Sequence, residues 1–337
     1  MVTESIIDIY QGKTILITGA GGFIGSSLTK SLVNVDCKLI LLDHSNNFTW
    51  IPEAKRADIS IIQGDVSFRQ TWESALSGVD YLFHLAAIEY NRKKFDIMQD
   101  MQINALSVMH LLESCRESHF NPLIIFSSSA NLFGQVGSLP VNERQQSNPM
   151  TLWSIHKLMA ENYFYVYALK YGIKSSILRL ANVYGPTENK MAMNNVVINN
   201  VISRALKGES LKLYRNHKCI RDFIFLGDVV TAFLHAGMKN NFQSDSNLFV
   251  IGSGEGETFT DIWRLIARKV YERTGKEIQV TYDDSVEIEP FDMRNFIADP
   301  TLFREVTGWQ PSTFLDEGIT LTINALLSSG DKASNAQ

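Results

Sequence analysis

A glycine-rich turn between an apolar run and a helical pattern constrains the fold of this chain more than any other segment. Residues 14–17 read Thr-Ile-Leu-Ile, and Thr18–Gly25 continues as Thr-Gly-Ala-Gly-Gly-Phe-Ile-Gly. At this spacing Gly19 permits a tight turn, Gly22 lets the backbone approach a pyrophosphate, and Gly25 lets the following helix pack against the strand. The turn therefore predicts a dinucleotide-binding site.

The segment after this turn is predicted to be an amphipathic helix. It opens near Phe23 and Ile24, and Ile24, Leu28 and Leu32 share one face. The positive N-terminal end of such a helix attracts the phosphates of a dinucleotide. Glycine turns also occur where strands merely end, but here a strand precedes the turn and a helix follows it, which favours cofactor binding.

The composition is typical of a folded globular protein. The 337 residues are 45% hydrophobic and 20% charged, and a net charge of −5 gives no broad electrostatic reason to bind nucleic acid or an anionic membrane. No apolar run approaches the ~20 residues of a membrane-spanning helix, and Glu4 and Asp8 stand where a signal peptide would be basic. The cysteines Cys37, Cys115 and Cys219 match no metal or disulfide spacing. We therefore expect a cytoplasmic protein without a metal.

Strand-like apolar runs alternate with helical patterns through the first half of the chain, which predicts a parallel sheet covered by helices on both faces. The helical patterns include Leu106–Cys115 and Ser154–Tyr171. The strand-like runs are Thr14–Thr18, Lys38–Leu42, Ile59–Ile62, Tyr81–Leu85, Leu123–Ser127 and Ser175–Leu180.

The pattern changes after Pro186, where helical segments at Asn194–Leu206 and Phe259–Glu272 are separated by short extended ones. We predict two domains from this change. They are a dinucleotide-binding domain of 1–185 with about 222–253, and a smaller substrate domain of 186–221 with 254–327. The polar segment 328–337 is predicted to be a disordered tail.

Two aspartates at strand ends bear on which dinucleotide binds. A carboxylate about twenty residues beyond the glycines suits the adenosine ribose hydroxyls, and Asp43 occupies that place. The residues that follow it, His44-Ser45-Asn46-Asn47, include no arginine for a 2′-phosphate, so the sequence predicts NAD. Asp65, before Val66, is expected near the adenine amino group. Both aspartates could instead be ordinary turn residues.

Further ordered segments resemble the extended short-chain dehydrogenase/reductase family, specifically its nucleotide-sugar epimerases and dehydratases. The resemblance covers almost the entire chain. Besides the glycine turn, the matching segments are His84–Ala87, Asn104, Phe126–Ser129, Leu178–Pro186, Arg221–Phe223, Asp228-Val229 and Gly308–Pro311.

This resemblance implies an α/β fold, a Rossmann-type doubly wound parallel sheet with a smaller C-terminal α/β substrate domain, and NAD as cofactor. It also implies a homodimer in which helices around Gln102–Cys115 and Ser154–Tyr171 pair with their mates. The expected cofactor-binding residues are Gly19, Gly22, Phe23, Ile24, Gly25, Asp43, Asp65, Val66, Leu85, Ala86, Ala87, Asn104 and Lys157.

The acid/base motif of this family is broken here. The family carries Tyr-x-x-x-Lys on one helix, where the lysine lowers the pKa of the phenol so that it can take a hydroxyl proton. In this chain Lys157 is present, but Trp153 stands at the tyrosine position, and the interval from Ser129 to Trp153 supports the alignment. An indole N–H only donates, so it cannot act as a base.

Three hypotheses stay open. In the first, an active enzyme uses another proton acceptor, either Tyr90 or Glu89 on the loop after strand four, or Lys157 if burial lowers its pKa. His156 is a poorer candidate, because neighbouring positions on a helix lie about 100° apart. In the second, the protein binds NAD and a nucleotide sugar without turnover. In the third, the substrate needs less help at this proton.

The residues after Ser129 bear on the subtype. Dehydratases of the family follow this serine or threonine with Asp-Glu, whereas Ala130 and Asn131 follow it here, which disfavours dehydration. Ser129-Ala130 resembles the 4-epimerases, in which the serine bonds the reacting hydroxyl; a strand-end cap is the alternative. The resemblance thus implies an epimerase or oxidoreductase that acts on a nucleotide-diphosphate sugar through a keto intermediate and nicotinamide hydride transfer.

Four residues are candidates for binding that substrate. Arg221 resembles the arginine that holds the diphosphate, since a guanidinium fork suits phosphate oxygens, although a structural role, held by Asp222 or the neighbouring backbone, is the alternative. Arg294 is a second candidate contact for phosphate or ribose. Asn182 is expected to touch the diphosphate or sugar, with a turn cap as alternative, and Asn195 to line the sugar pocket.

Overall fold

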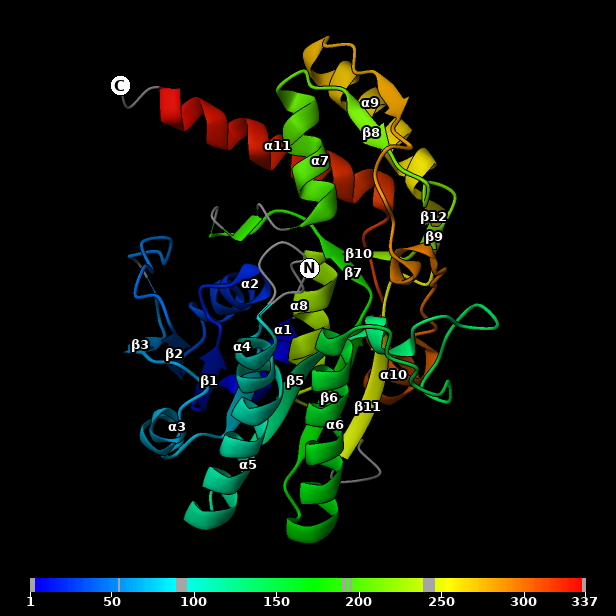
Figure 1. Ribbon diagram of the computed structural model, residues 1–337. Coiled ribbons are helices and arrows are strands. Elements are labelled where there is room, and N and C mark those ends of the chain that lie inside the picture. The colour runs from blue at the N-terminus through cyan, green and yellow to red at the C-terminus, as the bar shows by residue number, and fades with distance from the viewer. Residues whose placement is uncertain are drawn as a thin grey trace.

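Seven parallel strands form one sheet in the order β3-β2-β1-β4-β5-β6-β11 (Figure 1). The computed structural model describes residues 4–53, 55–88, 96–189, 192–193, 196–238 and 246–334. The sheet strands are β1 Thr14–Thr18, β2 Lys38–Asp43, β3 Asp58–Gln63, β4 Tyr81–His84, β5 Leu123–Ser129, β6 Ser175–Leu180 and β11 Ser246–Ile251. The order reverses at β1, so the crevice at the carboxyl ends of β1 and β4 is where such folds bind ligands.

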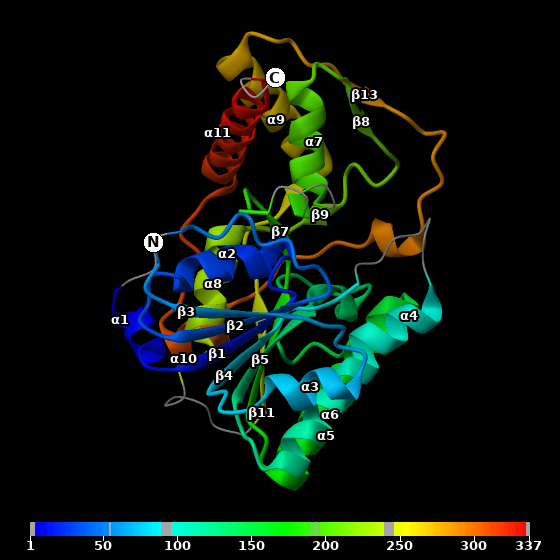
Figure 2. The same ribbon diagram turned by 90° about the vertical axis from the view of Figure 1, so that its left-hand side faces the viewer.

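Helices cover both faces of the sheet, as Figure 2 shows. Helices α2 (Phe23–Leu32) and α8 (Leu226–His235) pack on one face with Ile15 and Ile17, and the opposite face carries α3 (Arg69–Ala75), α5 (Ser107–Ser118) and α6 (Leu152–Tyr171), packed with Leu16. Successive strand residues point to opposite faces, so one apolar run serves both cores. The doubly wound fold expected from the sequence is confirmed.

A smaller group of elements lies beyond the carboxyl ends of the strands, at the top of Figure 1. Its core includes Ile198, Trp263, Ile266 and Ile319. Its elements are β7 Asn182–Tyr184, α7 Val197–Leu206, β8 Leu211–Leu213, β9 Ile220–Arg221, β10 Phe223–Phe225, β12 Glu257–Thr258, α9 Phe259–Thr274, β13 Val280–Tyr282 and α11 Leu315–Ser334. Shorter elements complete the described chain: α1 Glu4–Ile7, η1 Asp8–Tyr10, α4 Ile97–Met101, the π-turn η2 Gln102–Leu106, η3 Ala130–Phe133, η6 Pro290–Met293 and α10 Thr301–Thr307.

Two expectations about the second half differ from the structure. The sequence assigned all of 254–327 to the smaller domain, yet Phe303 of α10 packs against Phe249 of β11 with 5.0 Å between ring centroids, and Trp309 lies in the same core. Helix α10 therefore packs with the large sheet. The disordered tail predicted at 328–337 is wrong for 328–334, because α11 continues through Ser334 after Leu326 and Leu327 pack against the smaller core.

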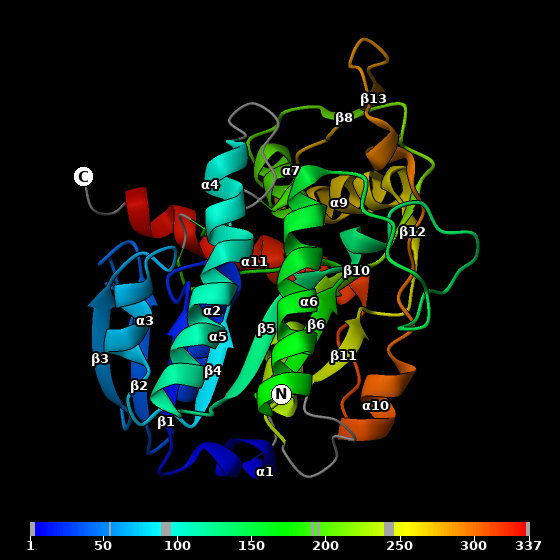
Figure 3. The same cartoon turned by 60° about the horizontal axis from the view of Figure 1, so that its bottom comes forward.

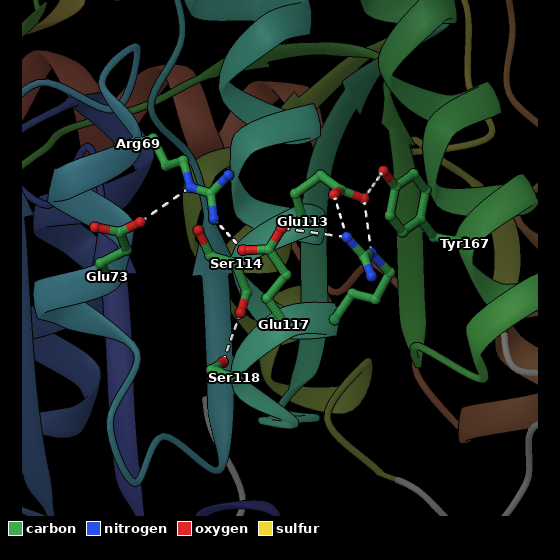
Figure 4. Close-up of polar contacts among 8 residues, drawn as sticks. Arg69, Glu73, Glu113, Ser114, Glu117, Ser118 and Tyr167 are labelled. Carbon is green, nitrogen blue, oxygen red and sulfur yellow. Dashed lines mark hydrogen bonds and ion pairs between the residues drawn. The ribbon is translucent and has the colours of Figure 1, made fainter.

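The outer ends of the helices on one face are joined by charged side chains. Helices α5 and α6 lie side by side (Figure 3), and Figure 4 shows Glu113 of α5 beside Tyr167 of α6, whose hydroxyl donates to it. Arg116 of α5 also donates to Glu113. Arg69 of α3 forms ion pairs with Glu73 and with Glu117. Exposed pairs of this kind contribute little to stability, about 0–1 kcal/mol each. Among the described residues, no helix is long and apolar enough to cross a membrane.

Candidate functional site

The glycine turn after β1 has a backbone that only glycine allows at two positions. Gly19 has a φ of +64°, and a Cβ there would lie 2.8 Å from the backbone of Ala86. A Cβ on Gly25 would lie 2.1 Å from the carbonyl oxygen of Gly19, inside van der Waals contact. The turn and the helix behind it therefore approach each other only because both residues lack side chains.

The same turn is built to receive an anion. Gly22 is the N-cap of α2 and provides no side-chain cap, so the N–H groups of the first turn, from Phe23 and Ile24 onward, face a ligand without side-chain competition. The Gly21 peptide is fixed from two sides, since its N–H donates to Asp43 Oδ2 at 2.9 Å and its carbonyl accepts from Asn189 Nδ2 at 2.6 Å. These features fit a dinucleotide pyrophosphate.

The expected adenosine-side residues surround this turn. Asp43, buried at the end of β2, also accepts from the Ser45 N–H at 3.0 Å, so it has the turn role as well. Each carboxylate oxygen has further lone pairs, and the ribose role of Asp43 stays a prediction. Asp65 accepts from the Ser67 N–H at 2.8 Å, another turn contact, and Val66 beside it is buried. The adenine role of Asp65 is likewise still a prediction.

The turn after β4 lies against the glycine turn. The backbone N–H groups of Leu85 and Ala86 each lie 3.2 Å from the hydroxyl of Thr18, and Ala87 follows them. The Thr18 hydroxyl also contacts His84 Nδ1 at 2.7 Å, and burial lowers the pKa of His84 to about 3. A neutral His84 thus fixes the junction of β1 and β4.

Lys157 is a buried ionisable group on α6. It lies one turn after Trp153 on α6, its side chain is buried, and its Nζ donates to the Ser127 carbonyl at 3.0 Å. The ammonium also lies 4.6 Å from the centre of the Phe126 ring. Burial lowers the pKa of Lys157 to about 8, although Glu161 and Asp100 oppose that shift. A neutral amine is therefore accessible near physiological pH.

The indole N–H of Trp153, where the sequence predicts the family's tyrosine, is already hydrogen-bonded within the protein. This N–H donates to the carbonyl of Ile88 at 2.6 Å, in the segment that follows β4. Asn104, held in the π-turn, donates to the same carbonyl at 3.0 Å. Trp153 consequently forms part of a wall that joins α6 to the turn after β4.

Ser129 ends β5, and its hydroxyl caps the next turn by accepting the Asn131 N–H at 3.1 Å. The capping alternative is thus present, and a bond to a sugar hydroxyl stays a prediction. The Asn131 side chain in turn accepts a hydrogen bond from Arg294. Asn182 donates to the Asp222 carbonyl at 2.9 Å. The contact with Arg294 joins the turn after β5 to the segment that follows η6, whereas the Asn182 contact lies within the smaller group of elements.

Two guanidinium groups are buried beside this turn. Arg221 and Arg294 are 4% and 5% exposed, and the described residues that contact them offer backbone carbonyls, the Asn131 amide oxygen, the Cys219 sulfur and aromatic rings, with no carboxylate ion pair. Burial and repulsion by Arg221 lower the pKa of Arg294 to about 9. Arg294 Nε is buried without a hydrogen-bond partner. Buried like charges with an unused donor favour an anionic ligand.

The neighbouring backbone does contact Arg221, whose guanidinium donates to the carbonyls of Ile220, Asp292 and Arg294. Among the described residues, the Asp222 carboxylate forms no ion pair with it, and the diphosphate role of Arg221 stays a prediction. Asp222 accepts instead from the N–H groups of Ser253, Gly254 and Ala298 and from the Ser253 hydroxyl, at 2.7 to 3.1 Å. The carboxylate of Asp222 therefore accepts hydrogen bonds from neighbouring loops, and Arg221 donates to backbone carbonyls.

The sequence interpretation missed one buried pair and named three residues outside the described ones. Glu89, Tyr90 and Asn195 lie outside the described residues. Asp100 and His156 form a buried hydrogen-bonded pair between α4 and α6. Nothing in their spacing, 56 positions apart, signals that contact. In the part of the chain that the structure describes, no cluster of His, Cys, Asp and Glu is arranged to hold a metal ion.

A doubly wound sheet with a glycine turn at its reversal point defines a dinucleotide-binding fold, and two buried guanidiniums lie beside the turn after β5. Comparison with known proteins identifies the family. A model of the NAD dependent epimerase/dehydratase family matches residues 15–252, and the chain belongs to that family. It is an enzyme family, and its cofactor is NAD.

Three relatives illustrate the similarity. UDP-glucose 4-epimerase of Mycolicibacterium smegmatis is 29% identical over 322 residues, which cover 91% of this chain and 96% of that protein. The crystal structure of UDP-glucose 4-epimerase from Thermotoga maritima with UDP-glucose matches with a TM-score of 0.82 and 28% identity, over 94% of this chain and 99% of that one. Thermus thermophilus UDP-glucose 4-epimerase in complex with NAD matches with a TM-score of 0.79 and 25% identity, over the same shares.

Proposed function

We propose that this protein is an NAD-dependent 4-epimerase or oxidoreductase of a nucleoside-diphosphate sugar, and that it works without an active-site tyrosine. The observation that carries the proposal is the contact between Arg294 and Asn131. Through it, the buried guanidinium pair lies next to the turn that Ser129 caps. A substrate with a diphosphate at one end and a reacting hydroxyl at the other spans such a site.

The guanidiniums account for the diphosphate end. Arg221 and Arg294 are fixed by backbone carbonyls and rings, so they are ordered before a ligand binds. Planar guanidinium forks match phosphate oxygens, and burial strengthens that attraction. We assign the diphosphate to these two residues, and the contacts of Asn182 and Asn195 remain part of the same proposal.

Lys157 is the best-supported proton acceptor at the other end. Bound NAD supplies the hydride acceptor and donor. As the sugar hydroxyl is oxidised to a ketone, its proton passes to the neutral Nζ of Lys157, and the same ammonium returns the proton when the ketone is reduced. A pKa of about 8 makes both forms available. Ser129 is assigned the hydrogen bond to the reacting oxygen; Glu89 and Tyr90 are the competing acceptors.

A second candidate function is that of an NAD- and nucleotide-sugar-binding protein without turnover. It is favoured by the indole of Trp153, whose N–H is committed to the Ile88 carbonyl and cannot accept a proton. Such a protein would keep the cofactor turn and the guanidinium pair but would lack the chemistry between them.

Turnover with a panel of UDP-, GDP-, CDP- and dTDP-sugars tests the proposal, with products resolved by chromatography. We expect a change of sugar configuration or oxidation state with at least one substrate in the natural protein. We expect Trp153→Tyr to give no gain, because the phenol loses the contact with Ile88. An inactive natural protein and an active Trp153→Tyr variant would establish the binding protein instead.

We also propose a homodimer formed through the outer faces of α5 and α6. Tyr165 and Leu169 on α6 are 62% and 74% exposed, and Val166 lies between them in sequence. Large apolar side chains gathered on one helix support an interface between copies. Light scattering should give twice the mass of one chain for the natural protein and a single-chain mass for Leu169→Glu. The control Leu302→Glu, on α10, should remain a dimer. A dimer that is also retained in Leu169→Glu would contradict this interface.

A further inference from the structure

Asp100 is a fully buried carboxylate whose two oxygens contact two different segments. It lies on α4, just before the π-turn. Its Oδ1 accepts from Asn104 Nδ2 at 2.6 Å, and its Oδ2 pairs with Nδ1 of His156 on α6. A buried carboxylate is costly unless both oxygens are satisfied, so its position fixes both partners.

Asn104 connects Asp100 to the segment after β4 that contacts Trp153. Its amide uses one hydrogen on Asp100 and the other on the Ile88 carbonyl at 3.0 Å. Trp153 donates to the same carbonyl at 2.6 Å. One carbonyl therefore holds two donors, and the position of the indole depends on that of the Asn104 amide.

His156 provides a second connection between Asp100 and Trp153, through α6. It lies three residues after Trp153, so the two side chains are neighbours on the helix surface. Asp100 thus holds α6 directly through His156 and holds the segment after β4 through Asn104. The π-turn places Asp100 and Asn104 together at this point, and π-bulges of this type are frequent at functional sites.

We infer that Asp100 is a positioning residue of the reaction, which fixes the indole of Trp153 and the imidazole of His156 as one rigid wall beside Lys157. The inference rests on the proposed function for its kinetic part only. In place of a tyrosine that reacts, this site has an indole that is held, and Asp100 holds it indirectly, through Asn104 and the Ile88 carbonyl.

The test compares Asp100→Asn with Asp96→Asn on the same helix. Asparagine at 100 keeps the volume but cannot accept from both His156 and Asn104, whereas asparagine at 96 still caps α4. With the substrate found in the panel, we expect kcat to fall about tenfold or more for Asp100→Asn, while its Kd values for NAD and UDP stay within about twofold of the parent. Asp96→Asn should match the parent.

Fluorescence reports on the wall without turnover. The chain has five tryptophans, so the emission of Trp153 is taken as the difference between each protein and its Trp153→Phe derivative. For Asp100→Asn we expect this emission to move to longer wavelength and to be quenched more readily by acrylamide. If the parent shows no turnover, the proposed function fails, and this emission still decides the inference.

A second pair of variants covers the case in which Asp100→Asn does not fold. His156→Asn keeps an amide donor at the place of Nδ1 and should retain the parent emission. His156→Leu has no donor and should reproduce the shifted emission and the lower kcat. Folded Asp100→Asn or His156→Leu protein with the parent emission and the parent kcat would overturn the inference.

Discussion

The glycine turn after β1 and the N-terminal end of α6 both contact the segment after β4 but are built in different ways. The turn is fixed by its backbone, because a Cβ at Gly19 or Gly25 would overlap main-chain atoms. The end of α6 is fixed by side chains that reach other segments, such as Trp153 to Ile88 and Lys157 to Ser127. A position fixed by its backbone accepts one residue type. A position fixed by side-chain hydrogen bonds can hold a different residue, provided that the new side chain finds a partner.

The largest expected effect is a loss of turnover when Lys157 is replaced, without a matching loss of NAD affinity. Replacing it by methionine keeps the stem of the side chain and removes the amine, so we expect turnover to fall by about 10²–10⁴-fold with NAD affinity changed far less. Steady-state kinetics and calorimetry measure the two quantities. Lys170→Met, exposed on the same helix, is the control and should behave as the parent.

The pH dependence of the natural protein sharpens that result. Burial lowers the pKa of Lys157 to about 8, so the neutral amine accumulates as the pH rises through that value. If the amine is the base, the rate of sugar oxidation should rise through about pH 8, and the rise should be absent in Lys157→Met. A rate that falls over this range would mean that the charged form is required, as in an enzyme whose base lies elsewhere.

The next effect tests the backbone constraint. Gly25→Ala places a methyl group 2.1 Å from the Gly19 carbonyl, and overpacking strain of about 3 kcal/mol corresponds to a loss of NAD affinity of about 100-fold. Calorimetric titration with NAD measures it. Gly137→Ala, where no heavy atom lies within 4 Å of the added methyl, should bind NAD normally. Equal affinity in both variants would show that the close approach at Gly25 is not required.

The smallest expected effect concerns the substrate side. Arg294→Met removes one of two guanidiniums, and hydrogen bonds to charged groups are worth about 1.5–3 kcal/mol, so UDP affinity should fall about 10- to 100-fold. NAD affinity should stay unchanged, because Arg294 contacts the turn after β5 and not the glycine turn. Arg304→Met, on the surface of α10, serves as the control. Unaltered UDP binding in Arg294→Met would remove that residue from the diphosphate site.

The comparison also explains what could be predicted from the sequence. The strands of the sheet follow from their apolar runs, and Gly19 and Gly25 from their spacing, because both depend on neighbours in the chain. The Asp100–His156 pair and the packing of Phe303 on Phe249 could not be predicted, since they join residues that only the fold brings together. Asp222 shows the same limit, because adjacency to Arg221 suggested an ion pair that the loops around it replace.

The central claim is that hydride transfer proceeds here with an indole at the tyrosine position. The most direct measurement is rapid mixing of the NAD-loaded protein with each nucleotide sugar, followed by absorbance in the reduced-nicotinamide band. We predict a transient rise with at least one sugar in the natural protein and its loss in Lys157→Met. No rise with any sugar in the natural protein, together with a rise in Trp153→Tyr, would contradict the claim.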